Sequence, residues 1–99
     1  MPLTENVIKK ISEDTGIEVD ELSKSALLAL LREKRRKLMI EKAEILSRYN
    51  VKNMEELEDK IKRGEIHEHP SWEDLIVLEN LEDILARLNE DMDAIQQTS

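Results

Sequence analysis

The stretch SWEDLIVLENLEDILARLNEDMDAI at residues 71–95 decides the fold class of this 99-residue chain. Its apolar side chains recur at alternating steps of three and four residues, which brings them onto one face of an α-helix. This face consists of Leu78, Leu81, Leu85, Leu88, Met92 and Ile95, and it is widened by Leu75 and Ile84. The spacing therefore predicts a long amphipathic helix over residues 71–95, capped at its start by Ser71.

A second long helix is predicted over residues 20–49, with Asp20 as its cap and Asn50 as its stop. One arc of its helical wheel, about 120° wide, is apolar, as in an amphipathic helix. The residues of this arc are Leu27, Leu28, Leu31, Leu38, Met39, Ile45, Leu46 and Tyr49. Between residues 22 and 31 the other faces are apolar too, so we expect this segment to be covered on more than one side.

Two shorter helices are predicted over residues 4–15 and 54–63. Thr4 and Asn53 are suitable caps for their first turns, and a glycine follows each helix, where it can adopt the left-handed conformation. The side of the first helix that we expect to be buried carries Leu3, Val7, Ile8 and Ile11. A helix of about three turns is too short to be stable alone, so it must dock on the rest of the chain.

These elements predict an all-α fold in one domain, residues 1–99: a long antiparallel helical hairpin with a short N-terminal helix and a connector helix. Residues 65–70 are expected to be extended, because Pro70 disfavours helical backbone at the residue before it. A lone hairpin would leave much apolar surface wet, so we expect a homodimer with a coiled-coil-like bundle of helices. The expected core and dimer positions are Leu27, Leu28, Leu31, Leu38, Ile45, Leu78, Leu81, Leu85 and Leu88. Leu31→Asp should abolish the dimer.

Composition argues against catalysis and against a membrane span. The chain contains no Cys, 2% aromatic and 38% charged residues. It shows no glycine loop, nucleophile motif or metal triad, so we expect a non-enzymatic protein without a cofactor. No apolar run approaches the ~18 residues of a membrane span, and no signal-peptide pattern opens the chain, so we expect a cytoplasmic protein. The Cys-free, charge-rich composition also resembles that of heat-adapted proteins.

The net charge of -8 is unevenly distributed. Residues 1–50 carry 10 basic and 9 acidic side chains, whereas residues 51–99 carry 5 and 14. Residues 24–48 alone hold 8 basic and 3 acidic side chains, so we expect the two long helices to attract each other. The acidic surplus could occupy a basic groove of a partner protein by mimicking phosphates. Alternatively, it only keeps the hairpin in solution.

The densest basic cluster lies at residues 32–37 and suggests nucleic-acid binding as the alternative function. Its candidate contacts to phosphate or to an acidic partner are Arg32, Arg35, Arg36 and Lys37. On a helical wheel these residues scatter around the circumference, so the sequence favours a protein partner over nucleic acid. Arg35 and Lys42 fall inside the apolar arc, and we expect their head groups to pair with acids of the last helix. The candidate acids are Asp74, Glu79 and Glu82.

Residues 4–33 resemble the paired helices of the ribbon-helix-helix family of repressors and antitoxins. The resemblance is carried by TENVIKKI at residues 4–11, EDTGIE at residues 13–18 and DELSKSAL at residues 20–27. It implies dimerising helices and an antitoxin-like regulator or adaptor. Only Met1-Pro2-Leu3 precedes the first helix, so the strand with which that family contacts DNA bases is missing.

The rest of the chain resembles small, uncharacterised archaeal helical proteins. The resemblance is carried by the sequence from YNV at residues 49–51, through MEELE at residues 54–58, to HPSWED at residues 69–74. It implies no particular activity.

Two further features are candidate sites. His67 and His69 are of a type that binds zinc or nickel, but two His with a spacing of two and no third His or Cys favour a loop without metal. Trp72 is the only Trp, and we expect it to anchor the connector against the hairpin, with blue-shifted fluorescence.

Overall fold

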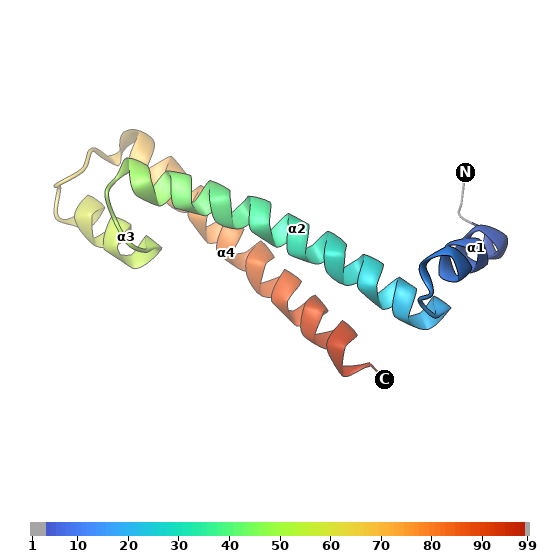
Figure 1. Ribbon diagram of the computed structural model, residues 1–99. Coiled ribbons are helices and arrows are strands. Elements are labelled where there is room, and N and C mark those ends of the chain that lie inside the picture. Colours follow the sequence, from blue (N-terminus) through green and yellow to red (C-terminus); the bar gives the residue numbers. More distant parts are fainter. Residues whose placement is uncertain (1–3, 99) are drawn as a thin grey trace.

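A computed structural model describes residues 4–98, apart from the side chain of Glu68, and over this range it is all-helical. Its helices are α1 (Glu5–Thr15), α2 (Val19–Arg48), α3 (Met54–Lys62) and α4 (Glu68–Gln97). The two long helices run antiparallel and pack along each other, α3 closes one end, and α1 lies beyond the other (Figure 1). The predicted all-α hairpin with a short N-terminal helix and a connector helix is therefore confirmed. None of the described helices is long and apolar enough to cross a membrane.

Polar contacts along the hairpin define its register. Lys24 donates to the backbone carbonyl of Thr98, the Arg35 guanidinium lies 3.2 Å from the side-chain oxygen of Asn89, and Lys42 pairs with Glu82. Along two antiparallel helices one residue number rises as the other falls, so the sum of the two numbers stays nearly constant. Here the sum is 122 or 124 for each pair, which shows that the helices stay in register over their common length. The prediction that Lys42 pairs with an acid of the last helix is confirmed. For Arg35 it is wrong, because its partner is an amide.

The register staggers the two long helices. Each has 30 residues, but Thr98, just after the end of α4, lies level with Lys24. The first turn of α2 and all of α1 therefore extend past α4, and at the other end α4 extends past α2. The molecule measures 60 × 28 × 19 Å, and its radius of gyration of 19.7 Å exceeds the roughly 13 Å of a compact chain of this length.

At the closed end of the hairpin, the last turns of α2 meet α3 and the first turns of α4. Leu57, Leu75 and Leu78 are almost completely buried there. The other buried apolar residues of the cluster are Leu38, Ile45, Leu46, Val51, Ile61, Leu81 and Leu85. Leu88 packs at the edge of the same cluster.

At the open end of the hairpin, by contrast, little is buried. Met92 is buried, but Leu28 and Leu31 are only half-buried and Leu27 is 51% exposed. Leu27 therefore lies outside the hairpin core, and its expected contact in a dimer stays a prediction. Helix α1 packs against α2, and none of its residues is buried.

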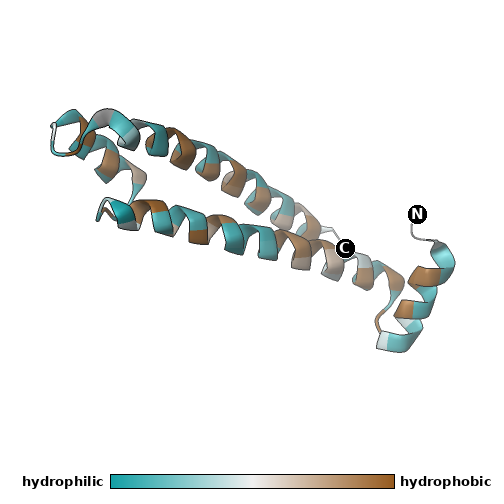
Figure 2. Ribbon diagram, turned by 90° about the horizontal axis from the view of Figure 1, so that it is seen from above, coloured by the Kyte–Doolittle hydropathy of each residue, from teal (hydrophilic) through white to brown (hydrophobic). Residues whose placement is uncertain are grey.

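The side of α1 that was expected to be buried is largely exposed as well. Val7 and Ile11 are each 42% exposed, and Ile8 is half-buried. Leu3, which was assigned to the same side, lies outside the described residues, as does the rest of Met1-Pro2-Leu3. Figure 2 shows the apolar residues of α1 beyond the end of the hairpin. The reason is the stagger, since α4 ends before it reaches α1.

The caps of the short helices follow the sequence. The backbone N–H of Val7 donates to Thr4 Oγ1 over 3.3 Å, and the N–H of Glu56 donates to Asn53 Oδ1 over 2.8 Å. The carboxylate of Glu56 accepts in turn from the N–H of Lys52 over 2.9 Å. Gly16 adopts the left-handed conformation after α1, with φ of 74°. These local signals act within a few residues, so sequence alone is sufficient to place them.

The starts of both long helices differ from the prediction. Helix α2 begins at Val19, without a side-chain cap, and not after Asp20. Helix α4 begins at Glu68, is interrupted by extended backbone at His69, and continues through Ser71. Ser71 is not a cap: it is completely buried, and its hydroxyl donates to the carbonyl of His67. Pro70 keeps His69 out of the helical region, as predicted, but a turn of helix forms around it.

We expect Leu78→Ala to lower the free energy of unfolding by about 2–5 kcal/mol, because it leaves a cavity in the closed-end core. Leu78 is 0% exposed, whereas Ile76, two residues away on the same helix, is 47% exposed. Urea denaturation followed by circular dichroism measures both variants. Ile76→Ala is the matched control and should change stability far less; equal losses would contradict this assignment of the core.

Trp72 is 47% exposed, which corrects the prediction of a buried anchor. Ser71 faces the core, and the next residue on an α-helix is turned by about 100° away from it. The fluorescence of this single Trp should therefore resemble that of indole in water and be quenched strongly by iodide. Emission shifted well to the blue, with weak quenching, would show that Trp72 is covered in solution.

Candidate functional site

The basic cluster at residues 32–37 does not form a single surface. Arg36 is held by a two-pronged hydrogen bond to Glu33, with distances of 2.9 and 2.7 Å. This bond lowers the pKa of Glu33 and raises that of Arg36. Arg35 turns to Asn89 on α4, while Arg32 and Lys37 are exposed on other sides of α2. The structure thus spreads the cations around the helix and does not bring them together along one phosphate-binding face.

The two histidines do not assemble a metal site either. His67 precedes the first turn of α4 and is exposed, and His69 Nδ1 lies 3.5 Å from Glu73 Oε1. Within the described part of the chain, no three His, Cys, Asp or Glu side chains converge on a common point. Both histidines are exposed, His67 just before α4 and His69 at the kink in its first turn.

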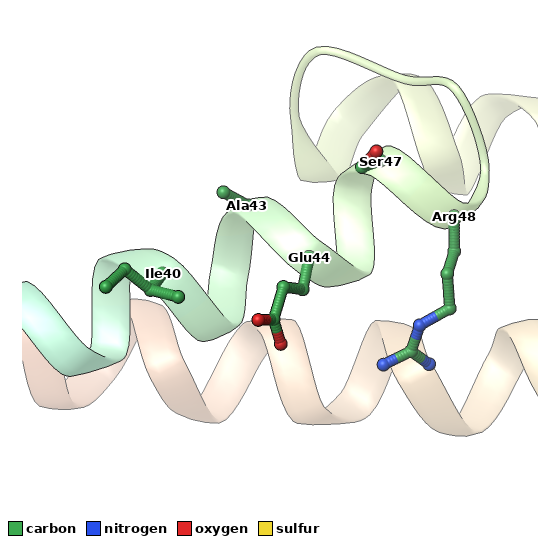
Figure 3. A pocket seen from close by; sticks show the side chains of 5 residues that line it. All are labelled: Ile40, Ala43, Glu44, Ser47 and Arg48. Atoms are coloured by element: carbon green, nitrogen blue, oxygen red, sulfur yellow. The ribbon is translucent and has the colours of Figure 1, made fainter.

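A hollow on the outer side of α2 near the closed end is lined by one helix only. Figure 3 shows its five residues, which are Ile40, Ala43, Glu44, Ser47 and Arg48. All five residues belong to α2, and their side chains point in different directions from that helix. A hollow lined by one helix is open to solvent, unlike the more enclosed clefts in which small ligands usually bind.

A polar cluster that sequence reasoning missed joins α2 and α4 at the closed end. The Tyr49 hydroxyl donates to the carboxylate of Asp74, and Arg48 lies 3.4 Å from the same oxygen. Burial raises the pKa of Tyr49 to about 12, assisted by the hydrogen bond to Asp74 and by the charge of that carboxylate. The sequence places Tyr49 in the apolar arc of the second helix, and only the register shows that Asp74 lies beside it.

The open end of the hairpin carries the largest group of uncovered apolar side chains on neighbouring elements. We define the open-end surface as the exposed apolar residues of α1, of the turn after it and of the first half of α2. Its large members are Val7, Ile11, Ile17, Val19, Leu27 and Leu30. Leu30 is the most exposed of them, at 64%. These six are more than half of the large apolar residues that the described chain exposes.

An apolar groove lies within this surface, where α1 crosses α2. It has a volume of about 320 Å³ and is lined by Ile8, Ile11, Leu22, Ser23 and Ala26. On the α2 side, Ser23 and Ala26 are too small to fill it. Single exposed apolar residues are ordinary on protein surfaces, whereas large apolar patches are typical of interaction surfaces.

Comparison with known families matches residues 1–99 to the Uncharacterized protein MJ0235 family. The chain belongs to this family. No curated protein and no solved structure matches it. The family match agrees with the resemblance to uncharacterised helical proteins, but it does not support the ribbon-helix-helix resemblance of residues 4–33.

The raised pKa of Tyr49 predicts how stability depends on pH. The unfolded chain loses the phenol proton near pH 10, whereas the folded protein keeps it up to about pH 12. The stability that this group contributes is therefore complete below pH 10 and is lost as the pH rises toward 12. Absorbance at the tyrosinate band measures the titration directly, since Tyr49 is the only Tyr.

Two variants serve as controls for this titration. Asp74→Asn keeps the size of the partner but removes its charge, so it should lower the pKa of Tyr49 toward 10. Tyr49→Phe has no phenol to ionise, so its free energy of unfolding should fall less between pH 10 and pH 12 than that of the unmodified protein. A native midpoint near pH 10 in the unmodified protein would show that Tyr49 is neither buried nor bonded to Asp74.

Proposed function

We propose that this family member is a non-enzymatic helical interaction protein that forms a homodimer through the open-end surface. The proposal includes a role as an adaptor or antitoxin-like regulator acting on a partner protein. In that role the closed end is the stably folded part of the hairpin, while α1 and the first half of α2 provide the contact surface.

The observation that carries the proposal is the uneven burial of apolar side chains. Leu57, Leu75 and Leu78 are buried at the closed end, whereas Leu27 and Leu30 are more than half exposed at the open end. Covering such residues in a partner interface removes apolar area from water, which favours association by about 25 cal/mol per Å² before its costs. A long, staggered hairpin with one uncovered end is therefore better suited to binding than to catalysis.

The acidic exterior of α4 supports the second part of the proposal. Residues 68–97 contain nine acidic side chains and one basic side chain, Arg87. Asp74 and Glu82 pair with α2, and the exposed acids of the helix include Glu79, Asp83 and Glu90. A negative surface of this kind would fit the basic groove of a partner protein. Because the cations of α2 are scattered around the helix, they support a nucleic-acid partner less than the acidic surface supports a protein partner.

We expect the protein to sediment with twice its chain mass of 11.6 kDa, and Leu30→Asp to convert it into a folded monomer. A carboxylate at this position would be buried without a partner in the dimer, but it would remain in water in the monomer. Sedimentation equilibrium gives the mass, and circular dichroism shows that the helices persist.

Ile76→Asp is the matched control, because Ile76 is also exposed on a long helix but lies near the closed end. It should leave the dimer intact. Leu31→Asp is a less specific test than the sequence suggested, since Leu31 is half-buried on the α4-facing side of α2 and also supports the hairpin. A monomeric unmodified protein at high micromolar concentration would contradict the proposal.

A further inference from the structure

Acidic and basic side chains are segregated along residues 13–37, at the open end of the hairpin. Residues 13–21, which connect α1 to α2, carry five carboxylates and no cation. Residues 32–37 carry five cations and one carboxylate. The midpoint between these two segments is near residue 26, which is also the middle of the apolar stretch at residues 22–31. Two independent patterns, one of charge and one of apolar residues, therefore share a centre at Ala26.

We infer that a second copy of this chain covers the open-end surface, with the two α2 helices antiparallel and crossing near Ala26. This inference rests on the proposed function and adds the orientation of the second copy. An antiparallel crossing is two-fold symmetric, so each contact occurs twice. The acidic segment at residues 13–21 of each copy then lies beside the basic segment at residues 32–37 of the other.

The shape of the surface fits this orientation. Leu30 projects from α2 and is the most exposed large apolar residue of the described chain. In an antiparallel pair centred near Ala26, Leu30 of one copy lies level with Ser23 of the other. Ser23 lines the groove between α1 and α2, together with Ile8 and Ile11. The leucine of each copy can therefore enter the apolar groove of the other.

The positions of the cations on the Leu30 side of α2 also agree with an antiparallel pair. Lys34 and Lys37 follow Leu30 by four and seven residues, so they lie on the same face of the helix. Lys34 lies level with Val19 of an antiparallel second copy, between the carboxylates of Glu18 and Asp20. A parallel pair would instead bring the two basic segments together and the two acidic segments together, which is unfavourable.

Charge reversal tests the orientation. We expect Lys34→Glu/Lys37→Glu and Glu18→Lys/Asp20→Lys each to weaken self-association at least tenfold. An equimolar mixture of the two variants should form a one-to-one heterodimer, because each copy then meets only opposite charges. Lys52→Glu/Lys62→Glu is the control: it changes the net charge as much as the first variant, but on exposed residues near the closed end. Sedimentation in low and high salt measures all four samples.

Spin labels measure the orientation independently, and the chain has no Cys to interfere. Glu41→Cys lies about 15 residues from the crossing point, so antiparallel helices separate its two labels by roughly 40 Å at 1.5 Å per residue. Ser25→Cys lies beside the crossing point and should give a much shorter distance. Both positions are exposed and outside the two charged segments.

These experiments distinguish failure of the proposed homodimer from failure of the antiparallel orientation. A monomeric unmodified protein overturns both the proposed function and this inference. A dimer that Leu30→Asp disrupts, but whose charge-reversed variants do not associate with each other, overturns the inference alone. Equal spin-label distances at residues 25 and 41 would likewise indicate a parallel pair and overturn it.

Discussion

The stagger between α2 and α4 is the constraint on which the rest of the structure depends. It arises at the closed end, where Leu57 of α3 packs among Leu75 and Leu78 of α4 and the last turns of α2. This core needs α4 to extend past the end of α2, since α3 could not otherwise reach it. With two helices of equal length, every residue by which α4 extends at one end is a residue of α2 left uncovered at the other.

Polar contacts specify this register but contribute little to the stability of the hairpin. Lys42 with Glu82 and Arg48 with Asp74 are partly exposed ion pairs, which typically contribute less than about 1 kcal/mol each. A hairpin shifted by one helical turn would leave these cations without their partners and would move Tyr49 away from Asp74. The apolar stripes alone would tolerate such a shift far better, because leucines repeat along both helices.

The uneven burial that results from the stagger connects the fold to the proposed function. The closed end has a core of its own and does not require a partner, whereas α1 and the first turns of α2 bury almost nothing within one chain. Covering the open end with a second copy would use apolar residues that the hairpin cannot reach. It would also use the opposite charges of residues 13–21 and 32–37, which are too far apart along α2 to neutralise each other within one chain.

The sequence by itself determined the number of helices, their approximate bounds, the caps at Thr4 and Asn53, and the antiparallel hairpin. These features depend on periodicity and on contacts within a few residues, which a single chain displays directly. Only the tertiary structure decided that Trp72 is exposed, that Ser71 is buried, and that Tyr49 meets Asp74. The physical reason is that an apolar stripe indicates which face of a helix is buried, but not which residue of the other helix lies opposite it. That register sets the stagger, and the stagger decides which apolar residues remain exposed.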